Sequence, residues 1–259
     1  NLTFSLGDAA SNGSVSLDGS LATYTPDANY NGDDSFTFSV SDGEYVASAS
    51  VTVFVAAVND APVLATVANV SFNEDGSGST SLSGSDVDGD DLTYSITGGT
   101  DISASLSGSD VSFSAPANYN GSESFIVAVT DGEYIDSQSI TVTVNAVNDA
   151  PTANAASGTT DEDQSVVITL SGDDIDGDNL TFSLGDAASN GSVSLDGSLA
   201  TYTPDANYNG DDSFTFSVSD GEYVASASVT VFVAAVNDAP VLATVLDISF
   251  DEDGTEFIN

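Results

Sequence analysis

The sequence predicts an all-β protein made of Greek-key β-sandwiches in a linear array. Three observations support this fold class: period-two alternation of apolar and polar residues, Asn-Gly and Asp-Gly pairs between the alternating stretches, and internal repetition. Residues 1–67 recur letter for letter as residues 179–245. A verbatim copy is typical of an extended array, in which length is the product rather than one active site.

Alternation marks the expected strands in order along each repeat. Leu2, Phe4 and Leu6 alternate with polar neighbours, and residues 140–144 alternate isoleucine or valine with threonine. Such runs of β-branched and aromatic residues indicate half-buried strands. Asn-Gly and Asp-Gly pairs separate them as tight turns. About seven short strands in roughly 90 residues fit a Greek-key sandwich.

A shorter period lies inside the verbatim copy. The motif Val-Asn-Asp-Ala-Pro recurs, and the steps from Asn59 to Asn148 and from Asn148 to Asn237 are 89 residues each. The predicted domains are a partial repeat lacking its first strands (1–60), two complete repeats (61–149 and 150–238) and the first strand of a further repeat (239–259). The partial repeat either continues in a longer array or is completed by strand addition from the tail of a neighbouring copy. The sequence leaves both alternatives open.

The charge is entirely of one sign. The 259 residues include 41 Asp and Glu and no Lys, Arg or His, for a formal net charge of −41. A carboxylate removed from water therefore needs backbone amides, hydroxyls, side-chain amides or a metal ion. Nucleic acid is excluded as a partner because no side chain can neutralise its phosphates. Zinc, copper and iron sites built from His or Cys are excluded too. No apolar run is long enough to insert directly into a membrane.

Three acidic motifs recur at fixed places in the repeat. They are an Asp-x-Asp-Gly-Asp loop, an Asn-Asp pair before Ala-Pro, and a Glu-Asp pair after the first strand. Carboxylates on alternate residues of a glycine-containing loop can converge on one cation, and calcium takes about six to eight oxygen ligands. The loop is not an EF-hand, because Thr97 stands at the twelfth position counted from Asp86. The alternative interpretation is an acidic surface for solubility in salty water.

Two of these motifs carry a family resemblance. Residues 86–96 resemble the Asp-x-Asp segment of cadherin repeats, and residues 139–151 resemble the cadherin linker strand with its Asn-Asp and Pro. The whole chain resembles the tandem cadherin-like repeats of giant bacterial surface proteins and biofilm adhesins. This resemblance implies cadherin-like, immunoglobulin-like sandwiches with calcium ions between consecutive domains. The mid-domain LDRE-type ligand motif of animal cadherins is missing, so we expect one or two ions per junction.

The resemblance also assigns calcium ligands, motif by motif. For the junction between the two complete repeats it implies Glu74, Asn148, Asp149, Asp174, Asp176 and Asp220. For the preceding junction it implies Asn59, Asp60, Asp86, Asp88 and Asp131. For the following junction it implies Glu162, Asn237 and Asp238.

These features predict an extracellular structural protein, at the cell surface or in a secreted matrix. It is either the calcium-rigidified stalk of a surface adhesin or the subunit of an extracellular filament or biofilm fibre. Its expected partners are neighbouring repeats or further copies, joined end to end. The alternative is an adhesion module that binds other cells or surface glycans, although no repeat carries an exposed aromatic cluster that its siblings lack. Paired carboxylates can hydrolyse glycosides, but the acids follow the repeat and are not gathered in one cleft. No enzyme is therefore predicted.

Overall fold

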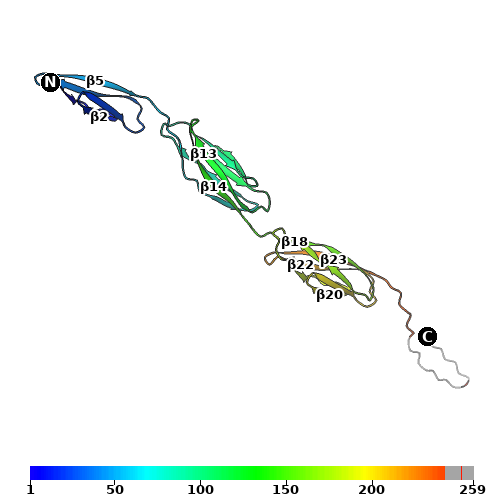
Figure 1. Cartoon of the computed structure of the whole chain (residues 1–259). Coiled ribbons are helices and arrows are strands. Elements are labelled where there is room, and N and C mark those ends of the chain that lie inside the picture. The colour runs from blue at the N-terminus through cyan, green and yellow to red at the C-terminus, as the bar shows by residue number, and fades with distance from the viewer. Residues whose placement is uncertain (243–251, 253–259) are drawn as a thin grey trace. The chain divides into compact units, whose positions relative to one another are not determined.

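The computed structural model describes residues 1–242 and residue 252. All regular elements within these residues are β-strands, which confirms the predicted all-β fold. The chain divides into two compact units, Asn1–Val147 and Asn148–Asn259 (Figure 1). Most of the predicted further repeat, 239–259, lies outside the described residues. The described part of the chain has no helix that could cross a bilayer.

Five strands form in residues 1–60 of the first unit. They are β1 (Thr3–Leu6), β2 (Gly13–Asp18), β3 (Leu21–Pro26), β4 (Gly32–Ser41) and β5 (Val46–Val55). Strand β4 lies between β1 and β5 in an antiparallel sheet, while β2 and β3 form a hairpin. Gly19 adopts a φ of 62° in this hairpin, a conformation that glycine takes without strain. The predicted Asp-Gly turn therefore forms here.

Nine strands follow in the same unit. They are β6 (Val63–Leu64), β7 (Val70–Asn73), β8 (Ser77–Ser81), β9 (Gly84–Ser85), β10 (Thr93–Gly98), β11 (Ser103–Ser107), β12 (Asp110–Ser114), β13 (Gly121–Thr130) and β14 (Ile135–Asn145). They form a four-stranded sheet in the order β10-β13-β14-β7, a three-stranded sheet in the order β11-β12-β8, and the short pair β6-β9. Green strands β13 and β14 are the long central hairpin in Figure 1.

The core of these strands lies between the two larger sheets. Val111 and Phe113 of β12 are buried together with alternate residues of β13 and β14. The rings of Phe113 and Phe125 meet edge to face, with centroids 5.3 Å apart. Ile126 is apolar but lies between buried Phe125 and Val127 and faces solvent, with 53% of its surface exposed. The period of two thus separates the core face from the outer face, as the sequence predicts.

The second unit repeats this plan. Its strands are β15 (Thr152–Asn154), β16 (Ala156–Asp161), β17 (Val166–Thr169), β18 (Ser171–Asp173), β19 (Thr181–Leu184), β20 (Gly191–Asp196), β21 (Leu199–Pro204), β22 (Gly210–Ser219) and β23 (Val224–Ala234). A four-stranded sheet has the order β16-β23-β22-β19, a three-stranded sheet has the order β17-β21-β20, and β15 pairs with β18. A second apolar core, which includes Tyr202 and Phe216, lies between the two larger sheets.

One parallel pairing in each unit positions the candidate site. Strand β7 runs parallel to β14, and β16 runs parallel to β23. All other strand pairs of the two units are antiparallel among the described residues. The parallel pairing brings the end of β7 beside the end of β14, and the end of β16 beside the end of β23, although a short strand, β6 or β15, precedes each of them in its repeat. The Glu-Asp pair therefore lies where the chain leaves the sandwich.

Candidate metal centre

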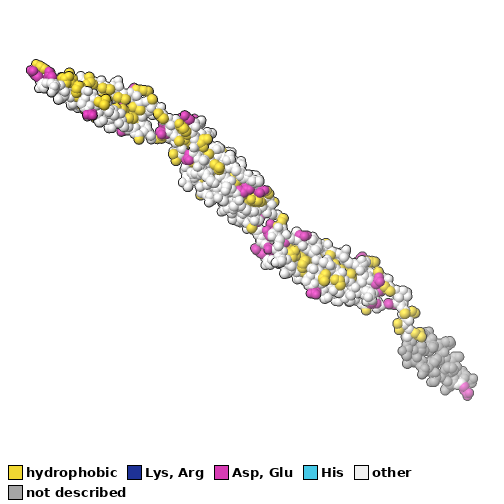
Figure 2. All heavy atoms as spheres, viewed as in Figure 1, with side chains coloured by type: hydrophobic (Ala, Val, Ile, Leu, Met, Phe, Trp, Pro, Cys, Tyr) yellow, Lys and Arg dark blue, Asp and Glu magenta, His cyan; other side chains and the backbone are white. Residues whose placement is uncertain are grey.

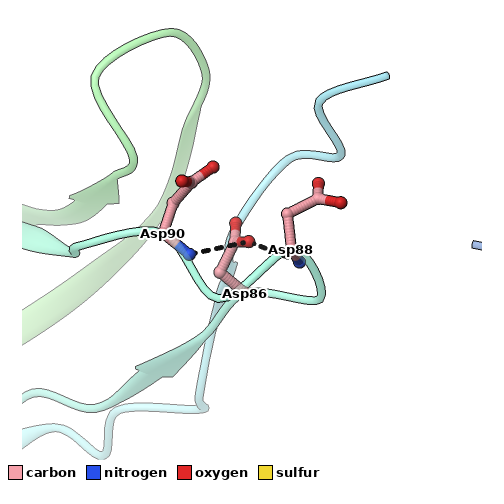
Figure 3. Close-up of side chains that lie close together, drawn as sticks. All are labelled: Asp86, Asp88 and Asp90. Carbon is pink, nitrogen blue, oxygen red and sulfur yellow. Dashed lines mark hydrogen bonds between the residues drawn. The ribbon is translucent and has the colours of Figure 1, made fainter. Parts of the chain in front are cut away.

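An acidic loop follows β9 in the first unit. One carboxylate oxygen of Asp86, Oδ1, accepts the backbone N–H groups of Asp88 at 2.8 Å and Gly89 at 3.1 Å. The N–H of Asp90 lies 3.5 Å from the same oxygen. Gly89 has a φ of 82°, which a residue with a side chain rarely adopts. The glycine in this motif thus lets the loop fold back around the Asp86 carboxylate, as Figure 3 shows.

The second carboxylate oxygen of Asp86 is a candidate metal ligand. Asp86 Oδ2 is buried and has no hydrogen-bond partner among the described residues. Ligand oxygens of Asp86, Asp88 and Asp90 all lie within 4.8 Å of one another. A buried carboxylate oxygen without a partner is costly, and no cationic side chain exists in the chain to relieve it. A hard cation that takes oxygen ligands, such as calcium, fits these residues.

The Asn-Asp pair of the preceding linker joins the same group. The side-chain amide of Asn59 donates to Asp131 Oδ2 at 3.0 Å. The backbone N–H of Asp60 donates to Asp88 Oδ2 at 2.7 Å. The structure therefore brings together the residues predicted for this junction, which are Asn59, Asp60, Asp86, Asp88 and Asp131.

The second unit builds the same arrangement from its own residues. Asn148 donates its side-chain amide to Asp220 Oδ2 at 2.9 Å, and the N–H of Asp149 donates to Asp176 Oδ2 at 2.7 Å. Asp174 Oδ1 accepts the N–H of Asp176 at 3.0 Å. Asp174 Oδ2 is again buried and without a hydrogen-bond partner in the described part of the chain. Two loops that differ only at their second residue, Val87 or Ile175, thus leave the equivalent carboxylate oxygen without a partner.

Asp131 and Asp220 serve as turn formers and also contact the linker. Asp220 Oδ1 accepts the N–H groups of Glu222 at 2.7 Å and Tyr223 at 2.6 Å, while its Oδ2 takes the Asn148 amide. Burial raises the pKa of the Asp220 carboxyl, but these hydrogen bonds outweigh it and hold the pKa below its usual range. The pKa of Asp131 is lowered in the same way, with burial opposed by backbone and Asn59 hydrogen bonds. Both carboxylates are therefore charged at neutral pH.

The Glu-Asp motif lies at the other end of each complete repeat. Glu74 has only 6% of its surface exposed, and its Oε1 accepts the N–H of Val147 at 2.5 Å. Glu74 Oε2 is buried without a hydrogen-bond partner among the described residues. Glu162, also 6% exposed, accepts the N–H of Val236 at 2.5 Å and a 3.5 Å contact from the Asn209 amide. Each glutamate therefore holds the backbone where the last strand gives way to the linker.

Sequence reasoning missed a strained pair of turns beside these glutamates. Asp163 and Asn207 have φ values of 61° and 57°, and the N–H of Asn207 donates to Asp163 Oδ1 at 3.1 Å. Asp75 and Asn118 repeat this pair, at 59° and 56° with a 3.2 Å bond. Left-handed conformations cost energy for residues other than glycine, and they persist where the surroundings enforce them. The recurrence of Glu-Asp and of Asn-Tyr-Asn-Gly was the available signal.

Two sets of predicted ligands stay predictions. Asn237 and Asp238 contact each other through a 3.2 Å bond from the Asn237 amide to the Asp238 carbonyl. No described Asp-x-Asp loop lies against them. Glu74 belongs to the first unit and the Asn148 group to the second, so their joint ligation stays a prediction. Asp90 was part of the predicted motif but was not among the predicted ligands.

The acidic side chains on the surface have no cationic side chain with which to pair. Figure 2 shows Asp and Glu side chains scattered over the visible face, with uncharged polar groups and backbone covering most of it. The chain has no Lys, Arg or His that could pair with them. Repulsion among the clustered carboxylates is thus relieved only by hydrogen-bond donors, solvent or bound cations.

Comparison with solved structures places the fold among known sandwiches. The crystal structure of mouse protocadherin-24 EC1-3 is 18% identical with a TM-score of 0.52, and the match covers 91% of this chain and 90% of that one. Human protocadherin-24 EC1-2 is 17% identical over 70% of this chain and 100% of its own, with a TM-score of 0.49. At these identities the likeness concerns the fold alone.

A third match is an endo-fucoidan hydrolase from glycoside hydrolase family 107, 21% identical over 92% of this chain with a TM-score of 0.31. The chain spans 39% of the length of that hydrolase. A comparison with curated proteins found no match. The family model for the bacterial Ig domain matches three times, at residues 1–54, 59–145 and 148–232. The chain therefore belongs to the bacterial Ig domain family, as a tandem array of cadherin-like β-sandwiches.

Proposed function

We propose that this chain is a calcium-stiffened structural segment of an extracellular array. It serves either as the stalk of a surface adhesin or as the subunit of a filament or biofilm matrix fibre. Bacterial Ig domains and cadherin-like folds are typically extracellular or surface modules. Repeats of this fold are typically non-enzymatic, and the proposal includes no catalytic step.

The observation that carries the proposal is a buried, unpartnered oxygen at the same place in two loops. Asp86 Oδ2 and Asp174 Oδ2 are both of this kind among the described residues. Their loops differ in sequence at the second position, Val87 in one and Ile175 in the other. The two loops share their other four residues, so the Asp-x-Asp-Gly-Asp sequence itself produces this geometry in both repeats. A calcium ion would supply the missing partner at both.

The residues proposed to hold the ion already accept hydrogen bonds from the linker. Asp176 and Asp220 take the N–H of Asp149 and the side-chain amide of Asn148, respectively. Asp88 and Asp131 do the same for Asp60 and Asn59. An ion bound beside them would neutralise the clustered charge and restrict the linker further. Glu74 and Glu162 are proposed as additional ligands of the junctions that follow their repeats.

The test removes calcium with a chelator and measures how stiff the chain remains. We expect that chelation of calcium from the full chain broadens the distance distribution measured by small-angle X-ray scattering. Protease cleavage at residues 57–62 and 146–151 should accelerate in parallel. Asp86→Asn with Asp174→Asn should reproduce the chelated behaviour in millimolar calcium. The matched control is Asp18→Asn with Asp196→Asn, because both are exposed residues at the ends of strands β2 and β20, next to their hairpin turns.

Two results would reject the calcium part of the proposal. One is unchanged scattering and unchanged cleavage on chelation. The other is equal loss of stiffness in the control variant, because this would mean that total charge matters rather than the loops. Either result would favour the alternative in which the acidity maintains solubility in salt.

A further part of the proposal is that copies join by strand addition. The pairing of β16 with β23 and of β17 with β21 shows how the segment before residue 179 completes the copy that follows it. The tail 239–259, most of which lies outside the described residues, is the proposed donor to residues 1–60 of a neighbour. Light scattering of the chain with and without residues 243–259 tests this. The proposal expects larger assemblies only with the tail, and it fails if mass is independent of the tail.

A further inference from the structure

An exposed phenylalanine stands on the outer face of the four-stranded sheet in the second unit. Phe232 lies on β23 with 51% of its surface exposed. Its cross-strand neighbours are Thr159 on β16 and Asp211 on β22. The adjoining row across the same strands consists of hydroxyl side chains, which are Ser157, Thr230 and Ser213. All six side chains share the outer face because paired residues lie on one side of a sheet.

These six residues line an open hollow with a volume of about 710 Å³. Ser189 and Asn190 also border it. The hollow is open rather than enclosed, so a ligand would lie against the sheet with one side in solvent. The hollow thus combines one flat apolar ring with a carboxylate and several hydroxyls, all accessible from solvent.

The other complete repeat uses the same position differently. Thr143 of β14 stands where Phe232 stands in β23, and it pairs with Ser122 of β13. The hydroxyls of Thr143 and Ser122 are 2.9 Å apart and bond each other. The two complete repeats therefore differ at this face by one exposed aromatic side chain, Phe232, rather than by an exposed aromatic cluster. The verbatim copy keeps the feature, since Phe54 is 75% exposed and pairs with Asp33.

The charge of the chain restricts what this hollow can bind. A net charge of −41 without any cationic side chain repels anionic ligands and offers them no counter-charge. A purely apolar ligand would leave the Asp211 carboxylate and the hydroxyls without partners. A ligand with an apolar face and several hydroxyl donors satisfies both parts of the hollow. Neutral saccharides have this chemistry, because one side of a pyranose ring presents C–H groups and its edge presents hydroxyls.

We propose that the Phe232 hollow is a binding site for a neutral saccharide. The sugar ring stacks on Phe232, and its hydroxyls donate to Asp211 and exchange hydrogen bonds with Thr159 and the serine–threonine row. The site recurs with the 178-residue period of the verbatim copy, because Phe54 and Phe232 are equivalent. The Phe54 face has no described counterpart of β16, so the Phe232 face is the more complete of the two. This activity is independent of the proposed calcium role.

The test is a titration of the full, nitrogen-15-labelled chain in millimolar calcium, followed by amide chemical shifts. The probes are cellohexaose, laminarihexaose and maltohexaose. At least one should shift the amides of residues 157–159, 211–213 and 230–232 together. Phe232→Ala should weaken that binding by about tenfold or more, since aromatic stacking is lost. Phe54→Ala should leave the Phe232 response unchanged.

Matched variants make the result decisive. Val167→Ala removes a side chain that is 59% exposed on another sheet of the same unit, and it should not alter binding. Thr143→Phe combined with Ser122→Asp rebuilds the pair in the first unit and should create a new set of shifts there. Absence of shifts with all three hexasaccharides at about 10 mM would overturn the proposal. Equal binding by the wild type and Phe232→Ala would overturn it as well.

Discussion

Residues 1–60 and 179–238 have the same sequence but differ in how much of it is buried. Tyr202 and Ala200 are fully buried at 0% exposure, whereas Tyr24 is half-buried and Ala22 is exposed. The second copy is covered by residues 150–178, whose strands β16 and β17 pair with β23 and β21. Two segments of identical sequence therefore bury their apolar side chains to different extents, because residues 150–178 pack against only the second of them.

The polar network, by contrast, is the same in both copies. Asp212 Oδ1 and Oδ2 accept the N–H groups of Ser189 at 3.0 Å and Asn190 at 2.9 Å, and Tyr202 donates its hydroxyl at 2.9 Å. Asp34 makes the corresponding bonds with Ser11, Asn12 and Tyr24 at 3.0, 2.9 and 3.0 Å. This network needs only residues within the 60-residue copy. Local hydrogen bonding is thus determined inside the copy, while burial of its core depends on the segment outside it.

The largest expected effect comes from supplying the covering segment. Fusing residues 150–178 directly before Asn1 reproduces the natural junction before Asn179 and should make the two copies equivalent. The free energy of opening of strands β3 and β5 should rise by about 5 kcal/mol or more, because several half-exposed apolar side chains become buried. Hydrogen exchange of the β5 amides measures this. A fusion of residues 61–89 is the control, and equal protection from both fusions would show that the pairing is not sequence-specific.

Equivalent phenylalanine-to-alanine substitutions in the two copies should differ by a smaller amount in their cost in free energy of unfolding. Phe216→Ala removes a side chain with 0% exposure and should cost about 3–5 kcal/mol. Phe38→Ala removes its half-buried counterpart and should cost less than half of that. Exchange rates of β23 and β5 amides report the two costs separately in each variant. Equal costs would contradict the claim that the covering segment completes the core.

The smallest expected effect is one of pH, and it should be shared by both copies. Burial raises the pKa of Asp34 and Asp212, but the hydrogen bonds to their carboxylates outweigh it and lower both values. A carboxyl whose pKa is lower in the folded state stabilises the fold above its unfolded pKa of about 4 and loses this effect as pH falls through the folded value. Acid unfolding should therefore steepen below about pH 4 in both copies. Asp212→Asn should flatten the response of the second copy alone.

The same network raises the pKa of its tyrosine. Desolvation and then the hydrogen bond to Asp34 raise the pKa of Tyr24 to about 12. The ultraviolet absorbance of tyrosinate in an alkaline titration measures this. Asp34→Asn should bring the Tyr24 transition back toward about 10. An unchanged transition would mean that desolvation, rather than the bond to Asp34, raises the pKa of Tyr24.

Local patterns predicted the fold and part of the candidate site. The alternation in residues 140–144 placed Ile140, Val142 and Val144 in the core, and each is at most 2% exposed. That worked because the two faces of a strand are fixed by neighbouring residues. The contact between Asp75 and Asn118 was not predicted, since it joins turns 43 residues apart. The exposure of Phe232 was readable from its place between Val231 and Val233, which the same alternation buries.

The most direct test of the calcium claim is a crystal structure of the chain grown in millimolar calcium, with anomalous scattering recorded. The account predicts an anomalous peak about 2.3–2.6 Å from Asp86 Oδ2 and another at the same distance from Asp174 Oδ2. Both peaks should disappear after soaking with a chelator. If both oxygens instead contact only water or a protein donor at this calcium concentration, calcium does not hold these loops and the central claim is wrong.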